Sequence, residues 1–315
     1  MEKKITILVP VYNESEVLPH LYGELIKITG ELEYDFQFLF VNDGSTDDSL
    51  EIITGFSKSD SRVCCVDFSR NYGKEVAMAA GFDYAVGDAV IIMDADLQHP
   101  PAVIKELIAG WKQGYDDVYT RKVSRQGESA LKKTTSRLFY WMLEKLTRLD
   151  INKGASDFRL LSRRAVDELK KYRETQRYTK GLYTEIGFPK KAVEFEQQPR
   201  FAGKTKWNYV QLTKLAIEGV TSFSTLPLRF ATILGIITGI VAMCYIVWIV
   251  IKSIVWGEPV AGYPSLMCTI LFIGSVQLVC TGIIGEYLGR VFKETKRRPL
   301  YIVKQYIENR PQNNG

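Results

Sequence analysis

Two long runs of uncharged, mostly apolar residues near the end of the chain constrain its fold more than any other feature. They cover residues 230–251 and 263–285. Each run exceeds the roughly 20 residues that a helix needs to cross about 30 Å of hydrocarbon. A buried helix of a soluble core rarely continues so far without a polar face. Two such runs in tandem therefore predict two transmembrane helices.

Charges around these runs predict the orientation of the chain. Lys252 and Glu258 lie between the runs, whereas a cluster of basic residues follows the second: Arg290, Lys293, Lys296, Arg297 and Arg298. Cytoplasmic segments of membrane proteins carry an excess of Lys and Arg. The start of the chain, Met1-Glu2-Lys3-Lys4, does not resemble a signal peptide. We therefore expect a multi-pass protein of the cell (inner) membrane, with both termini and the first 225 or so residues in the cytoplasm.

The composition narrows the class of protein. The formal net charge is +5. Much of the positive charge lies in the C-terminal tail and at residues 121–137, where anionic lipid headgroups are a natural partner. With only 2 His and no strong metal-ligand spacing, neither a zinc protein nor a nucleic-acid-binding protein is supported. The 5 Cys include no Cys-x-x-Cys spacing and indicate a reduced, cytoplasmic chain.

The first 120 residues alternate short apolar runs with helical patterns. We expect strands at residues 4–9, 36–41, 63–68, 89–93 and 117–120, and helices at residues 14–29, 47–57, 74–85 and 101–113. This alternation predicts an α/β domain with a mostly parallel sheet covered by helices on both faces. Residues 127–149 and 207–226 form amphipathic patterns. Such helices can lie on a membrane surface, and for residues 127–149 packing on the sheet is an equal alternative.

Polar and acidic residues follow three of the predicted parallel strands. They are residues 10–14, residues 42–49, and Asp94-Ala95-Asp96 after the strand at 89–93. The carboxyl ends of parallel strands meet at one edge of a sheet, where ligands bind. Two carboxylates two positions apart supply hard oxygen ligands for Mg²⁺ or Mn²⁺ carrying a diphosphate. Structural roles stay open for part of this set, because Thr46, Asp47 and Ser49 can cap a helix and Asp43 can form an Asx-turn.

Six motifs in order along the chain resemble family 2 glycosyltransferases of the GT-A fold. They are residues 10–14, 42–49, 71–75 with Gly81, 94–101, 156–161 and 200–207. With two C-terminal spans, the whole is similar to the polyprenyl-phosphate glycosyltransferases, the branch that includes bactoprenol glucosyltransferases and dolichyl-phosphate mannose synthases. The resemblance covers nearly the entire chain. Each motif alone is weak, but the ordered set is specific.

The resemblance implies an organisation of the chain. A cytoplasmic GT-A domain with a Rossmann-like, mostly parallel sheet would occupy residues 1–205. A juxtamembrane amphipathic helix at 206–228, two transmembrane helices within 229–289 and a basic cytoplasmic tail at 290–315 would follow.

The resemblance also implies roles for individual residues. The nucleotide-sugar would be bound by Pro10, Tyr12, Glu14, Asp43, Lys74, Asp94, Arg200 and Lys204. Asp96 would bind the metal that bridges the donor diphosphate, with Asp94 beside it, and Gln98 would face the sugar or the acceptor. Asp157 matches the position usually assigned as the catalytic base. Candidates for the acceptor phosphate are Arg121, Arg125 and Arg137.

The chemistry of the acceptor leaves the role of Asp157 open. A phosphate monoester has a second pKa of about 6, so it is largely dianionic at pH 7 and needs no base to attack. Asp157 could orient the phosphate or take a proton from the monoanion. The structural alternative is an ion pair with Arg159 or Arg163.

The expected reaction is inverting transfer of one sugar from a UDP-sugar, glucose first among the candidates, to undecaprenyl phosphate or a similar polyprenyl phosphate. The product would be a lipid-linked sugar for cell-envelope glycosylation. GDP-mannose and UDP-GlcNAc are alternative donors. The partners are the donor, the carrier lipid and the bilayer, with a separate flippase expected and a homo-oligomer left open.

Three other functions compete with this one. A processive polysaccharide synthase would have more spans and a Gln-x-x-Arg-Trp motif, and the near match Gln176-Arg177-Tyr178 lacks its spacing and its Trp. A dinucleotide oxidoreductase would carry Gly-x-Gly-x-x-Gly after the first strand. A catalytically silent membrane protein that binds sugar nucleotides stays open, although Asp94, Asp96, Asp157 and Arg200 argue against it.

Overall fold

The computed structural model describes residues 3–122, 155–175, 177–195, 226–256 and 262–308 of the chain. The chain divides into two compact units, one of Met1–Tyr209 with Pro299–Gly315 and the other of Val210–Arg298. The amphipathic segments expected at 127–149 and 207–226 lie outside the described residues, apart from residue 226. The expected site residues Arg125, Arg137, Arg200 and Lys204 also lie outside them.

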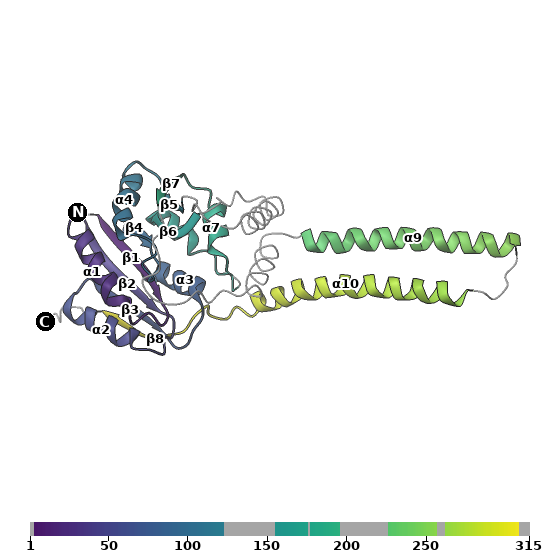
Figure 1. Cartoon of the computed structure of the whole chain (residues 1–315), viewed down its shortest axis with the longest axis horizontal. Helices are drawn as coiled ribbons and strands as arrows, with labels where there is room; N and C mark the ends of the chain where they lie inside the picture. Colours follow the sequence, from purple (N-terminus) through teal and green to yellow (C-terminus); the bar gives the residue numbers. More distant parts are fainter. Residues whose placement is uncertain (1–2, 123–154, 176, 196–225, 257–261, 309–315) are drawn as a thin grey trace, which may run out of the picture. The chain divides into compact units, whose positions relative to one another are not determined.

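An eight-stranded sheet forms the frame of the first unit (Figure 1). Its order is β7-β5-β6-β4-β1-β2-β3-β8. The strands are β1 (Lys4–Val11), β2 (Asp35–Asn42), β3 (Val63–Phe68), β4 (Ala89–Ile92), β5 (Asp117–Lys122), β6 (Ala155–Ser162), β7 (Lys190–Phe195) and β8 (Val303–Glu308). The centre is parallel as predicted, because β1 pairs in parallel with β2 and β4, and β2 with β3. The whole sheet is mixed, since β6 and β8 run antiparallel to their neighbours.

The helices of this unit follow the predicted alternation with the strands. They are α1 (Leu18–Thr29), α2 (Ser49–Ser59), α3 (Lys74–Tyr84), the 3-10 turn η1 (Pro101–Val103), α4 (Ile104–Lys112), α6 (Arg163–Leu169) and α7 (Thr179–Glu185). The strands and helices expected in the first 120 residues are confirmed, with small shifts at their ends. The largest shift is at α1, which begins at Leu18 rather than at residue 14, because the preceding residues form a loop.

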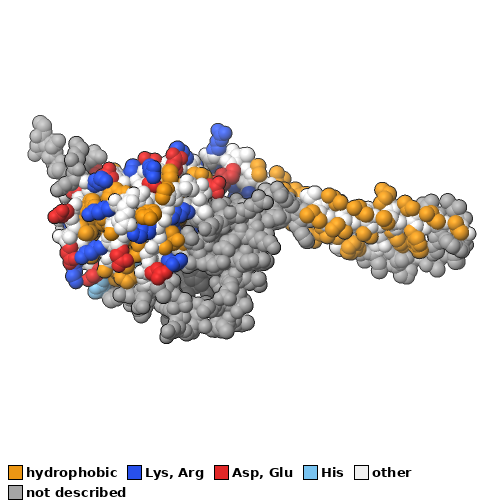
Figure 2. Space-filling view, turned by 90° about the horizontal axis from the view of Figure 1, so that it is seen from above, with side chains coloured by type: hydrophobic (Ala, Val, Ile, Leu, Met, Phe, Trp, Pro, Cys, Tyr) orange, Lys and Arg blue, Asp and Glu red, His pale blue; other side chains and the backbone are white. Residues whose placement is uncertain are grey.

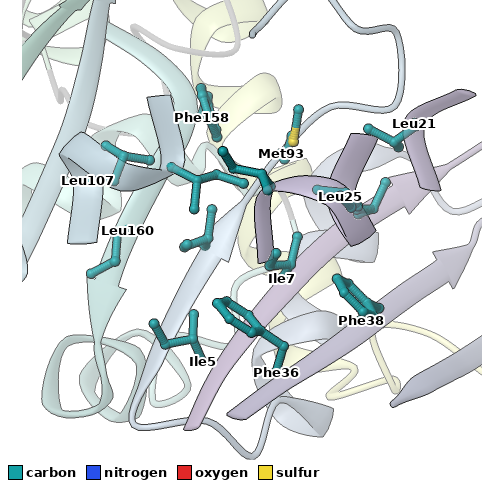
Figure 3. Packing of buried hydrophobic residues seen from close by; sticks show 14 of the residues in the cluster. Ile5, Ile7, Leu21, Leu25, Phe36, Phe38, Met93, Leu107, Phe158 and Leu160 are labelled. Carbon is teal, nitrogen blue, oxygen red and sulfur yellow. The ribbon is translucent and has the colours of Figure 1, made fainter. Parts of the chain in front are cut away.

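Alternate residues of the central strands build one core layer. Figure 3 shows Ile5 and Ile7 of β1 and Phe38 of β2 in the same cluster as Leu25 of α1 and Leu107 of α4, and all five are buried. Burial of a side chain of this size contributes about 1.5–3 kcal/mol. Because a slip of one residue would turn these side chains to the other face, the layer fixes the register in which the strands end together.

Helix α3 packs closely on the opposite face of the sheet. Its buried side is made largely of small residues, and a Cβ on Gly81 would lie 2.2 Å from the Cδ1 atom of Leu8 in β1. Small residues let a helix approach a sheet closely. This packing holds the start of α3, with Lys74, near the carboxyl ends of the parallel strands.

The segment expected to be a basic tail, residues 290–315, contains regular structure. Helix α10 continues to Thr295, and β8 joins the sheet antiparallel to β3 (Figure 1). The strand pattern of β8 is weak in the sequence because this edge strand is only partly covered. Two of its residues, Val303 and Ile307, are half-buried and the others are exposed.

The second unit contains a pair of long helices, α9 (Leu226–Trp256) and α10 (Tyr263–Thr295). The two lie side by side, and the Cys280 thiol donates a hydrogen bond of 3.4 Å to the carbonyl oxygen of Ala231 (Figure 1). Large apolar side chains are exposed along both helices, among them Ile237 of α9 and Leu278 of α10, and Figure 2 shows hydrophobic side chains over the described surface of this pair. Among the described residues, one segment, Phe272–Thr295, is long and apolar enough to cross a membrane, and α9 contains a shorter apolar stretch, Ala231–Tyr245.

Candidate active site

A cavity of about 430 Å³ lies at the carboxyl ends of β1, β2 and β4. It is lined by Pro10, Val11, Tyr12, Glu14, Asp43, Asn71, Gly73, Lys74, Ala77, Asp94, Ala95, Asp96 and Gln98. The lining contains eight residues for which the sequence predicts a role in binding the donor, the metal or the sugar: Pro10, Tyr12, Glu14, Asp43, Lys74, Asp94, Asp96 and Gln98. The structure therefore brings together residues that are up to 88 positions apart, from Pro10 to Gln98.

The loop after β1 is held by side chains from the loop after β2. The backbone N–H of Asn13 donates to Ser45 Oγ at 3.0 Å, that of Glu14 to Ser49 Oγ at 3.0 Å, and that of Ser15 to Asp47 Oδ2 at 3.1 Å. Asp47 also accepts from the Ser49 backbone N–H at 3.1 Å, although the N-cap residue of α2 is Asp48. These bonds fix the loop that presents Tyr12 and Glu14 to the cavity.

Asp43 binds a loop far along the chain. Its carboxylate accepts hydrogen bonds from the backbone N–H groups of Tyr72 at 2.6 Å and Gly73 at 2.8 Å. Burial raises the pKa of Asp43, and the two N–H groups offset part of that rise. The adjacent Gly44 has φ +65°, and a Cβ there would lie 2.4 Å from the backbone carbon of Arg70. Only glycine fits this close approach, by which Asp43 and residues 70–73 form one wall of the cavity.

A partly buried charge cluster extends from Lys74 of α3, at the cavity, to Asp157 of β6. The ammonium of Lys74 lies 2.5 Å from Asp94 Oδ1 and 3.0 Å from Asp157 Oδ2, and Lys180 Nζ lies 4.0 Å from Asp157 Oδ1. Burial opposes the charge of Asp157, but Lys74, Lys180 and Arg159 outweigh it and hold the pKa of this carboxyl well below its usual range. Burial likewise opposes the charge of Lys74, and the two carboxylates outweigh it and raise the pKa of Lys74. Lys74 and Asp157 are therefore both ionised at neutral pH.

The loop that carries the acid pair adopts an unusual backbone conformation. Leu97 has φ +56°, and the backbone N–H of Gln98 donates to Asp96 Oδ1 at 3.2 Å. A left-handed conformation costs a residue other than glycine about 1–2 kcal/mol and persists only where the surroundings impose it. The turn brings Asp96 and Gln98 to the same cavity as Asp94.

His99 ties this loop to β6. Its Nε2 atom lies 2.7 Å from Ser156 Oγ in a hydrogen bond, and its ring packs between Phe158 and Phe195. Burial lowers the pKa of His99, which keeps the ring neutral at neutral pH. Because Ser156 precedes Asp157, His99 links the acid pair to the far side of the charge cluster. This role is not predicted from the sequence, although His99 follows the acid pair within the same motif.

A second set of residues around Asp157 is also absent from the sequence-based predictions. Glu75 of α3 accepts a hydrogen bond of 2.8 Å from the backbone N–H of Thr179, the first residue of α7, and this brings Lys180 to Asp157. The structural alternative for Asp157, an ion pair with Arg159 or Arg163, is wrong for the described residues, since Arg163 pairs with Asp167 at 3.7 Å. Arg159 instead pairs with Asp117 at 3.0 Å, where both side chains are almost fully buried.

Comparison with known proteins now identifies the family. Residues 6–170 match the model of glycosyl transferase family 2, and residues 226–291 match the GtrB C-terminal hairpin. The chain belongs to glycosyl transferase family 2. It is therefore a glycosyltransferase with the GT-A type of α/β fold.

Relatives of this glycosyltransferase match it over nearly its whole length. A glycosyltransferase of Synechocystis sp. is 44% identical over 96% of this chain and 95% of its own. A prophage bactoprenol glucosyl transferase homolog of Escherichia coli is 41% identical over 96% of this chain and 99% of its own. The bactoprenol glucosyl transferase of Shigella phage SfII is 41% identical over 98% of this chain and 100% of its own.

Solved structures resemble the glycosyltransferase unit more distantly. Glucosyl-3-phosphoglycerate synthase from Mycobacterium tuberculosis, in complex with Mn²⁺, UDP and glucosyl-3-phosphoglycerate, is 18% identical with a TM-score of 0.46. The likeness covers 70% of this chain and 78% of that chain.

The structure does not bring the one described basic candidate for the acceptor into the cavity. Arg121 of β5 lies 2.5 Å from Glu194 of β7 in an exposed ion pair, and it is not among the residues that line the cavity. Lys74 is the basic residue in the described lining, and Lys180 lies beyond it on the other side of Asp157.

The residues of the acid pair suit a divalent cation. Among the described residues, no three His, Cys, Asp or Glu side chains converge on one point. Mg²⁺ in nucleotide sites usually takes one or two carboxylates and completes its shell with phosphates and water. Asp94 and Asp96, with the amide oxygen of Gln98, provide oxygen donors of that kind at the cavity.

Proposed function

We propose that this glycosyltransferase transfers one sugar from a nucleotide-sugar to a polyprenyl phosphate. The observation that carries the proposal is the cavity at the carboxyl edge of the sheet, which combines an acid pair with Lys74, and Lys74 in turn pairs with Asp157. The relatives named bactoprenol glucosyl transferase support a lipid phosphate as the acceptor. The apolar surface of α9 and α10 is consistent with an acceptor held in a bilayer.

In this proposal the donor is a UDP-sugar, with UDP-glucose as the first candidate. Tyr12 lines the cavity with 43% of its surface exposed, so its ring is available to stack on a base. GDP-mannose and UDP-GlcNAc are the alternative donors. GDP-mannose differs from UDP-glucose in the base and in the configuration at one sugar carbon, and UDP-GlcNAc differs in one substituent of the sugar.

Asp94 and Asp96, helped by Gln98, would hold Mg²⁺ or Mn²⁺ together with the donor diphosphate. A bound divalent cation would neutralise negative charge on the diphosphate as it leaves. Lys74 already places a positive charge at Asp94, and we propose that its ammonium contacts the diphosphate as well.

The transfer itself is a single displacement. An oxygen of the lipid phosphate forms the bond to the anomeric carbon, the bond to the diphosphate oxygen breaks, and the nucleoside diphosphate leaves with the electron pair. The configuration of the sugar therefore inverts. The acceptor is largely dianionic at pH 7, so it does not require a base.

Asp157 then acts as a positioning residue rather than as a base. A carboxylate whose pKa is held low by Lys74, Lys180 and Arg159, against the effect of burial, is a poor proton acceptor. Its two oxygens instead face Lys74 and Lys180 and hold both ammonium groups in place.

The membrane arrangement is part of the proposal. We propose that both α9 and α10 cross the inner membrane and that the catalytic unit and both termini are cytoplasmic. The amphipathic segments would rest on the inner leaflet and, with Arg121, Arg125, Arg137, Arg200 and Lys204, would attract the acceptor phosphate or the donor. A separate flippase would move the product, and a homo-oligomer is compatible with this arrangement.

The test is a donor panel with the full-length protein in detergent. Polyprenyl phosphate, Mg²⁺ and each sugar nucleotide are incubated with wild type, Asp96→Ala and the exposed control Glu106→Gln, and the lipid product is analysed by mass spectrometry. We expect one monoglycosylated lipid with wild type and Glu106→Gln and none with Asp96→Ala. Unchanged turnover in Asp96→Ala would place the metal elsewhere, a ladder of products would indicate a polysaccharide synthase, and no consumption of any donor would indicate a silent binding protein.

A further inference from the structure

We infer that the segment that follows the membrane hairpin, residues 299–308, helps to form the donor site by positioning one wall of the cavity. We call this segment the C-terminal clasp. The wall is the loop at residues 69–73, which contributes Asn71 and Gly73 to the lining. The inference rests on the proposed binding of a nucleotide donor in this cavity.

The clasp is hydrogen-bonded directly to the loop. The backbone N–H of Ser69 donates to the carbonyl oxygen of Ile302 at 3.1 Å. The hydroxyl of Tyr72 lies 3.2 Å from Ser69 Oγ. The hydrogen bond to Ser69, with Arg70 nearby, lowers the pKa of Tyr72. The clasp therefore contacts the loop at Ser69, and Ser69 in turn contacts Tyr72.

Tyr301 anchors the clasp through its ring and its hydroxyl. The ring stacks on Phe68 with centroids 5.1 Å apart, and Phe68 in turn packs edge-on against Tyr72 at 5.5 Å. The hydroxyl donates to Asp83 Oδ2 at 2.7 Å. Arg173 holds the same carboxylate with two hydrogen bonds of 2.7 and 2.8 Å. The clasp is thus fixed to α3 and to the segment after α6, as well as to β3.

The far side of the loop faces Asp43. The backbone N–H groups of Tyr72 and Gly73 donate to its carboxylate, and Gly44 leaves no room between the two segments. The loop therefore lies between Asp43 on one side and the clasp on the other. Removal of the clasp contacts would leave the backbone of Gly73 held from one side only.

A second route connects the clasp to the same wall. Gln305 Nε2 donates to Asp67 Oδ2 at 3.3 Å, and Asp67 Oδ1 accepts a hydrogen bond of 2.7 Å from Asn42 Nδ2. Asn42 immediately precedes Asp43. The clasp is thus connected to the Asp43 hydrogen bonds in two ways. One set of contacts reaches Tyr72, which donates to Asp43, and the other reaches Asn42, which precedes Asp43.

The wall of the cavity depends on residues that come late in the chain. The described residues that line the cavity all lie in the first 98 positions, but a support of their wall is made by residues that follow α10. A chain that has not yet returned from the hairpin lacks that support. We therefore expect the clasp to affect the affinity for the nucleotide and not the affinity for the lipid.

The experiment compares two tyrosines of the clasp in the full-length protein in detergent. Tyr301→Ala removes the stacking on Phe68 and the bond to Asp83, whereas Tyr306→Ala removes a ring that packs on Tyr84 of α3. Affinity for UDP, or for GDP if wild type binds it more tightly, is measured by calorimetry. Donor KM, acceptor KM and Tm are measured in parallel. We expect Tyr301→Ala to raise the nucleotide Kd and the donor KM about tenfold, and Tyr306→Ala to leave both within about twofold. The acceptor KM should be unchanged in both variants.

Tyr301→Phe keeps the ring and removes only the hydroxyl, so it reports on the clasp if Tyr301→Ala does not fold. We expect about a threefold rise in nucleotide Kd from this variant. Equal weakening in Tyr301→Ala and Tyr306→Ala, or a rise in acceptor KM that matches the rise in donor KM, would indicate general destabilisation and overturn the inference. If wild type binds nucleotide and both Tyr301 variants bind it equally well, the inference alone fails. If wild type binds no nucleoside diphosphate, the proposed function fails first.

Discussion

Lys74 of α3 donates a hydrogen bond of 3.0 Å to Asp157 of β6, across 83 positions of the sequence. The same ammonium lies 2.5 Å from Asp94, one member of the acid pair. A single cation thus joins the donor side of the cavity to the side that carries Asp157. In the proposed function it meets the negative charge of the donor diphosphate, and it keeps Asp157 in its ionised form.

Removal of this cation should damage both catalysis and stability. In Lys74→Met, Asp94 and Asp157 lose their shared partner, and we expect turnover to fall by at least about 100-fold. Because a partly buried carboxylate loses its partner, the free energy of unfolding should fall by about 1–3 kcal/mol. The matched control is Lys105→Met, which breaks an exposed ion pair with Glu31 and should stay within about 0.5 kcal/mol of wild type. Turnover is measured with saturating substrates and stability by thermal unfolding in detergent; near-normal turnover would remove Lys74 from the mechanism.

The pH dependence of stability should follow the charge of Asp157. Its folded pKa lies below the unfolded value of about 3.9, because Lys74, Lys180 and Arg159 outweigh burial. The stability from this group is therefore present above the unfolded pKa and is lost as pH falls through the folded pKa. In Lys74→Met, burial is opposed by fewer cations, so the pKa of Asp157 should rise above its unfolded value and into the range of the measurement. Unfolding free energies measured between pH 4 and 7 should show the gap between wild type and Lys74→Met shrinking toward pH 4. A gap that is constant across this range would mean that Asp157 is not the group linked to Lys74.

The buried ion pair of Asp117 and Arg159 supports the segment of β6 that carries Asp157. The pair is 3.0 Å apart, and Arg159 also donates to the carbonyl oxygen of Ser156 at 3.0 Å, next to Asp157. Asp117→Asn would leave Arg159 charged without its counterion, and we expect a loss of about 3–5 kcal/mol in unfolding free energy. Asp167→Asn, which removes an exposed partner of Arg163 at 3.7 Å, should cost less than about 1 kcal/mol. Equal Tm values for the two variants would contradict the importance assigned to burial.

Much of the first half of the fold can be predicted because its signals are local. The strands in the first 120 residues are short apolar runs, the helices between them are periodic, and a parallel arrangement follows from the alternation. Since parallel strands end at one edge, their order along the chain already predicts that Asp43 and the acid pair meet. The structure confirms that they line one cavity.

The rest of the fold and of the candidate site depends on contacts between distant segments, which local sequence patterns do not predict. Strand β6 enters the sheet antiparallel between β4 and β5, which brings Asp157 to Lys74, and no periodicity predicts that position. Helix α7 has only seven residues, so its pattern is too short to predict Lys180 at the site. Strand β8 is an edge strand after a run of charges, and its sequence is typical of a tail. The roles of His99 and Tyr301 follow from these placements and could not be foreseen without them.

The proposed reaction requires the phosphate of the lipid acceptor, and this requirement can be measured directly. Full-length protein with Mg²⁺ and the preferred nucleotide-sugar is given polyprenyl phosphate, the same polyprenol without phosphate, or a water-soluble alcohol, and each product is weighed by mass spectrometry. We expect a product heavier than polyprenyl phosphate by one sugar residue, and none from the other two acceptors. Comparable glycosylation of the polyprenol or of the soluble alcohol would contradict the proposed reaction.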